Sequence, residues 1–144
     1  GFYIASSILG KNNFEVACLD LSFYKDYRTA IEYYIKAEQL RKDTNIYFRQ
    51  IKAYEGLQDN DNAAACYKKI LAMDKGNKTA INNLLVIYQK QGRYRDGKNV
   101  LDAFIEQNPD LAKDKDIMPL LNVFSENNVK TIEARQNLIK NMGL

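Results

Sequence analysis

The sequence has 144 residues, of which 46% are hydrophobic and 27% are charged, as expected for one soluble globular domain with a sizeable core. Its longest apolar runs have five residues, far fewer than the roughly eighteen that a membrane helix needs, so we expect no membrane insertion in this segment. The 21 Lys and Arg and 18 Asp and Glu residues are spread evenly along the chain, whereas a nucleic-acid binder usually concentrates its positive charge.

The first ten residues, GFYIASSILG, place Phe2, Ile4, Ile8 and Leu9 at helical spacing. The chain begins at Gly1 without an initiator Met. We therefore expect residues 1–10 to be the end of a preceding helix, truncated at its start.

Three similar units follow, at residues 11–43, 44–77 and 78–111. The stretches DYRTAIEYYIKA, DNDNAAACYKKI and RYRDGKNVLDAF begin 33 and then 34 residues apart. Each is preceded by a second amphipathic stretch and a short polar turn, which is typical of short helix connections. The predicted helix pairs lie near 12–24 and 27–40, 44–57 and 60–73, and 78–91 and 94–107.

In the second helix of each unit, a small residue is followed one helical turn later by a large one, and these positions align between the units. The small ones are Ala30, Ala63 and Gly97, and the large ones are Tyr34, Tyr67 and Leu101. A small residue allows a neighbouring helix to approach closely, and a larger residue there would overpack the contact. We therefore expect all six positions to be buried.

Residues 112–144 begin with a charged linker, and the segments IMPLLNVFSENN and VKTIEARQNLIKNMG predict two more helices. We expect a degenerate helical hairpin that caps the array, because terminal units of repeat proteins need a polar outer face. Ala134 and Leu138 are the candidates for its small and large packing positions.

This period and pattern resemble the tetratricopeptide repeat, most clearly through Tyr88, Gly92, Tyr94, Gly97 and Pro109. The match covers residues 11–111, with departures: Lys25 and Gln58 replace the turn glycine, Asn60 the following aromatic residue, and Lys42 and Lys75 the closing proline. The resemblance implies an all-α, right-handed superhelical array of antiparallel helix pairs. It also implies that the first helix of each pair lines a concave groove for a peptide segment of a partner.

The resemblance places groove residues on all three first helices. They would be Asn12, Glu15, Leu19 and Ser22; Asn45, Phe48, Arg49, Lys52 and Glu55; and Thr79, Asn82, Asn83, Val86 and Gln89. We expect the peptide-binding chemistry to centre on Phe48, Arg49, Lys52, Asn82, Asn83 and Gln89.

Arg49 and Lys52 lie one helical turn apart and could bind a carboxylate or an acidic motif of the partner. Alternatively, Glu55 could pair with Lys52, and any single groove residue could be ordinary solvated surface. An adjacent Asn pair, Asn82 and Asn83, is unfavourable within a helix, and hydrogen bonds to an extended ligand would compensate for that cost.

The sequence predicts neither catalysis nor a cofactor or metal site. It contains no His, and it has no phosphate-binding loop or nucleophile motif. Cys18 and Cys66 lie in different units within helical patterns, so we expect both to be reduced and unpaired.

Two functional hypotheses remain open, an adaptor that binds a partner peptide and a structural spacer of a larger helical-repeat protein. Nucleic-acid binding is a distant third. The sequence gives no information on self-association or on the compartment, for which the cytoplasm is the default expectation.

Overall fold

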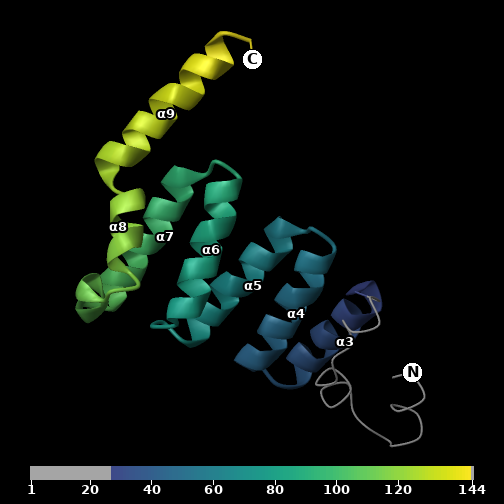
Figure 1. Cartoon of the computed structure of the whole chain (residues 1–144). Helices are drawn as coiled ribbons and strands as arrows, with labels where there is room; N and C mark the ends of the chain where they lie inside the picture. Colours follow the sequence, from purple (N-terminus) through teal and green to yellow (C-terminus); the bar gives the residue numbers. More distant parts are fainter. Residues whose placement is uncertain (1–26, 144) are drawn as a thin grey trace, which may run out of the picture. The chain divides into compact units, whose positions relative to one another are not determined.

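The computed structural model describes residues 27–143, and this part of the chain is helical with no strand (Figure 1). It forms two compact units, the first ending at Met73 and the second beginning at Asp74. The all-α prediction is confirmed. The segment 1–10 and the helix predicted near 12–24 lie outside the described residues.

The described part of the first unit contains the helices α3 (Tyr27–Leu40), α4 (Thr44–Gly56) and α5 (Asn60–Met73). Helix α4 packs against both α3 and α5. These bounds agree with the predicted helices to within one residue. Asp43 fixes the start of α4, because its carboxylate accepts a hydrogen bond of 2.8 Å from the backbone N–H of Asn45.

The core of the first unit follows the predicted alternation of small and large side chains. Ala30 and Ala63 are fully buried, and Tyr34 and Tyr67 are almost fully buried. The apolar cluster between α3 and α4 comprises Ala30, Ile31, Tyr34, Ala37, Ile46 and Ala53. The small residues are therefore part of a dense core, as their register predicts.

The second unit contains α6 (Lys78–Lys90), α7 (Tyr94–Gln107), the short 3-10 helix η2 (Pro109–Lys113), α8 (Met118–Val123) and α9 (Glu126–Asn141). Helix α6 packs against α7, and α7 in turn contacts η2 and α9. The bounds of α6 and α7 again agree with the prediction to within one residue. The two helices predicted after the charged linker are α8 and α9.

Gly97 on α7 is buried, as predicted, and the structure shows what fills the space beside it. A Cβ atom at this position would lie 2.5 Å from Cε1 of Phe124, which follows α8. The Phe124 ring is 2% exposed and packs against Tyr94 with 5.7 Å between ring centroids. Because Gly97 has no side chain, the Phe124 ring can pack directly against α7.

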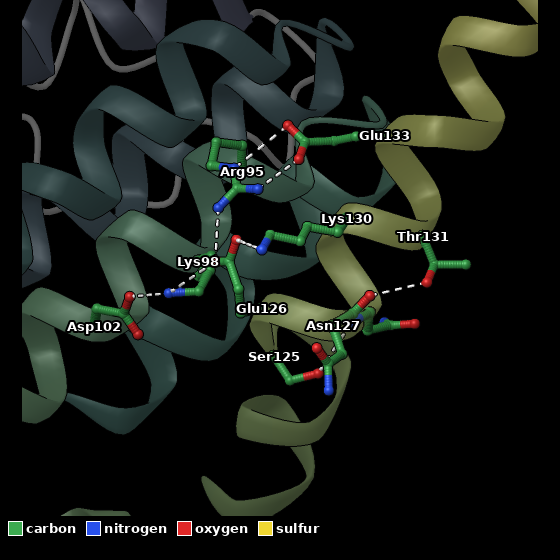
Figure 2. Close-up of polar contacts among 10 residues, drawn as sticks. Arg95, Lys98, Asp102, Ser125, Glu126, Asn127, Lys130, Thr131 and Glu133 are labelled. Atoms are coloured by element: carbon green, nitrogen blue, oxygen red, sulfur yellow. Dashed lines mark hydrogen bonds and ion pairs between the residues drawn. The ribbon is translucent and has the colours of Figure 1, made fainter.

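Polar contacts fasten α9 to α7, as Figure 2 shows. The guanidinium group of Arg95 donates to the carboxylates of Glu126 at 2.8 Å and of Glu133 at 2.5 Å. These hydrogen bonds hold the pKa of both carboxyl groups below the usual value. Val129 is the one buried side chain of α9, so ion pairs rather than a broad apolar face position this helix.

The expectation for Ala134 and Leu138 is wrong. Both residues are exposed, Leu138 at 61%, so they do not fill small and large packing positions. The reason is that α9 contacts α7 through Glu126 and Glu133, which bind Arg95. Farther along α9, Gln136 donates from its side-chain amide to the backbone C=O of Gly92, in the turn before α7, at 2.9 Å.

The turns after α4 and α6 share one backbone conformation. Gly92 has a φ of 70°, and the equivalent Gln58 has a φ of 58°. A residue with a side chain in this left-handed region is strained by roughly 1–2 kcal/mol. Gln58, which stands where the repeat pattern has glycine, therefore lowers stability, while the turn keeps its left-handed residue.

Replacing Gln58 by Gly is expected to raise the free energy of unfolding by about 0.5–1 kcal/mol, because the relief of strain exceeds the added entropy of the unfolded chain. Gln58 is exposed, so no packing is lost. Urea titration followed by circular dichroism measures the effect. Gly92→Gln is the reciprocal control and should lower stability; a stabilising effect of that change would contradict the account.

Candidate functional site

An open hollow of about 420 Å³ lies along one face of α4. Its lining residues are Tyr34, Asn45, Phe48, Arg49 and Lys52, and we call it the α4 hollow. The four α4 residues follow three- and four-residue steps, so one helix brings them onto one face. Three of the six residues that the sequence singled out thus lie together.

The α4 hollow combines an aromatic side with positive charge. The half-buried Phe48 ring meets Tyr67 of α5 edge to face, with 6.5 Å between centroids. Arg49 is also half-buried and forms no ion pair with another residue in the described part of the chain. A guanidinium group in this setting can donate two parallel hydrogen bonds to a carboxylate.

The carboxylate of Glu55, one turn beyond Lys52, accepts a hydrogen bond of 3.3 Å from the Tyr67 hydroxyl. This contact connects the end of α4 to α5. Glu55 therefore has a structural role, and its pairing with Lys52 stays a prediction.

The other three candidates lie on α6 in the second unit. Asn82 and Gln89 are exposed, and Asn83 is half-buried. Asn82, Val86 and Gln89 share one face of the helix by their spacing, which leaves an amide at each end of an exposed apolar side chain. Their convergence with the α4 hollow stays a prediction, and Asn12, Glu15, Leu19 and Ser22 lie outside the described residues.

Sequence reasoning missed a polar network on the opposite face of α4, centred on Glu38 of α3. The Glu38 carboxylate accepts hydrogen bonds from the Tyr47 hydroxyl at 2.8 Å, from Nε2 of Gln50 at 3.2 Å and from Nζ of Lys69 at 3.3 Å. Gln50 is 1% exposed, so the network satisfies a polar group that would be costly to bury alone. A Gln at a core position of the helical pattern was the available signal.

The network shifts several pKa values. Burial by itself raises the pKa of Glu38, but the hydrogen bonds from Gln50 and Tyr47 and the charge of Lys69 outweigh it and lower the pKa. Burial, followed by the hydrogen bond to Glu38, raises the pKa of Tyr47 to about 12. Glu38 is therefore ionised and Tyr47 protonated at neutral pH.

Cys66 lies beside this network as a free, buried thiol, while Cys18 lies outside the described residues. Burial is the main reason that its pKa is raised to about 11. Its Sγ is 3.4 Å from Oε1 of Gln50, to which the thiol donates. Since the thiolate is the reactive form, Cys66 has the properties of a packing residue.

Within residues 27–143 there is no group of three or more His, Cys, Asp or Glu side chains placed to hold a metal ion. None of the helices in the described part is both long and apolar enough to span a bilayer. The chemistry that the site offers is hydrogen bonding, charge pairing and apolar contact.

The model of the tetratricopeptide repeat family matches residues 54–114. The match runs from the end of α4 to just beyond η2, so this part of the chain is similar to tetratricopeptide repeats. Such repeats are modules of protein–protein interaction. A search of the curated proteins finds no match to the chain.

Proposed function

We propose that the chain is a non-catalytic adaptor that binds an extended segment of another protein through the α4 hollow. The observation that carries the proposal is Arg49, a half-buried cation with no ion pair among the described residues, in a hollow of about 420 Å³ beside Phe48. Burial of an unpaired charge is unfavourable. An acidic group of a ligand would remove that cost.

In this proposal the partner presents a carboxylate to Arg49 and Lys52 and an apolar side chain to the Phe48 ring. Bidentate pairing with the guanidinium group sets the position of the carboxylate, and the aromatic contact contributes apolar burial. The amides of Asn82, Asn83 and Gln89 take part through hydrogen bonds to backbone groups of a bound segment. Asn82 and Gln89 are exposed on α6 and Asn83 is half-buried, which supports this role.

Reversing both charges of the α4 hollow is expected to abolish capture of the partner. The variant Arg49→Glu with Lys52→Glu replaces attraction of a carboxylate by repulsion, and it should weaken binding by about tenfold or more, which is 1.4 kcal/mol or more. The measurement is a quantitative pull-down from native lysate with equal amounts of folded protein. The matched control is Lys113→Glu with Lys115→Glu, which makes the same change in net charge at two exposed residues of the second unit.

The proposal predicts that the control retains the partners that the α4 variant loses. If the α4 variant retains every partner and the control loses them, the adaptor hypothesis fails. The alternative then gains support: a spacer of a larger helical-repeat protein that makes its contacts outside the groove.

A further inference from the structure

A second hollow, of about 350 Å³, lies between α3 and α5. Its apolar part consists of Ile35, Tyr54, Ala65 and Cys66, and we call it the α3–α5 hollow. Helix α4 contributes Gln50 and Tyr54 to it. At 100° per residue, those two residues lie about 100–160° around the helix from Arg49 and Lys52, so the two hollows lie on different faces of α4 that point largely away from each other.

The apolar part of the α3–α5 hollow is open to a ligand. Ile35 is 40% exposed, and Ala65 is exposed with no longer side chain to fill the space in front of it. An exposed branched apolar residue beside a concave surface is typical of a place where another apolar side chain is buried. The volume exceeds what one leucine side chain needs.

The charged lining of the hollow has a net positive charge. Of the residues that line the hollow, Lys42 and Lys69 are cations and Glu38 is the one acidic residue. Glu38 accepts hydrogen bonds from Tyr47, Gln50 and Lys69, so the charges of Glu38 and Lys69 compensate each other and Lys42 is the cation that gives the lining its positive charge. An acidic partner would therefore be attracted to this surface and a basic one repelled.

We propose that the α3–α5 hollow is a second docking site, which binds an apolar side chain flanked by acidic residues on a partner protein. This site goes beyond the α4 hollow, because the two surfaces face away from each other and can be occupied together. The chain would then join two partners, one on each face of α4.

The proposal is tested by NMR titration of the isotope-labelled full chain with three capped pentapeptides. The first is Asp-Glu-Leu-Glu-Asp, the second has Ser in place of Leu, and the third is Lys-Lys-Leu-Lys-Lys. Capping removes the terminal charges, so no free C-terminal carboxylate is present. We expect the first peptide alone to shift the amide signals of Ile35, Ala65 and Cys66.

Two variants identify the site. Ala65→Trp fills the hollow at an exposed position and should abolish these shifts. Lys42→Glu should weaken binding of the first peptide about threefold, because it replaces attraction of the acidic residues by repulsion. Lys115→Glu is the charge-matched control and should leave the affinity unchanged.

The proposal is overturned if none of the peptides shifts these signals, if the Ser peptide binds as well as the Leu peptide, or if the acidic peptide shifts only signals around Phe48 and Arg49. That last outcome would support the α4 hollow alone. Conversely, Arg49→Glu with Lys52→Glu should leave binding at the α3–α5 hollow unchanged. The two proposed sites can therefore be confirmed or refuted independently.

Discussion

Replacement of Phe124 by alanine is expected to lower the free energy of unfolding by about 3–5 kcal/mol, the range for removal of a buried aromatic ring. The ring is 2% exposed, packs against Tyr94 and fills the space beside Gly97. Its loss would leave a cavity where α7 meets the chain between α8 and α9. Urea titration followed by circular dichroism measures the change.

Two controls test whether the contact with Gly97 is the cause. Met118→Ala shortens a side chain on α8 that is 51% exposed and should change stability by less than about 0.5 kcal/mol. Gly97→Ala should destabilise the wild type by about 1–3 kcal/mol through overpacking. In the Phe124→Ala background the added methyl group has room, so the same change should be neutral or stabilising. Additive effects of the two substitutions would contradict this packing.

Replacement of Ala63 by leucine is expected to destabilise the protein by about 1–3 kcal/mol, because it forces three more carbon atoms into a filled core. Ala63 is 0% exposed, and it lies on the face of α5 that carries the buried Tyr67 and Ile70. The same urea titration measures the loss.

Ala65→Leu is the matched control, since it makes the same chemical change two residues away at an exposed position. It should alter stability by no more than about 0.5 kcal/mol. Equal losses in the two variants would show that the assignment of the packing face of α5 is wrong.

For the described residues, the sequence by itself predicted helices α3 to α9 and the small and large core positions of α3, α5 and α7, but not those of α9. This was possible because both depend on spacing within one helix: apolar residues at three- and four-residue steps define a face, whatever it packs against. The grouping of Phe48, Arg49 and Lys52 was predictable for the same reason. Gly92 marked its turn because its positive φ is a local property of the backbone.

Only the tertiary structure decided which residues meet across helices. The contact of Gly97 with Phe124, the ion pairs of Arg95 with α9 and the network around Glu38 join residues from different helices. Spacing along one helix contains no information on these pairings, because they depend on how the helices approach one another. The two hollows on different faces of α4 follow from that packing, so a periodic pattern could indicate which residues face outward but not where the surface is concave.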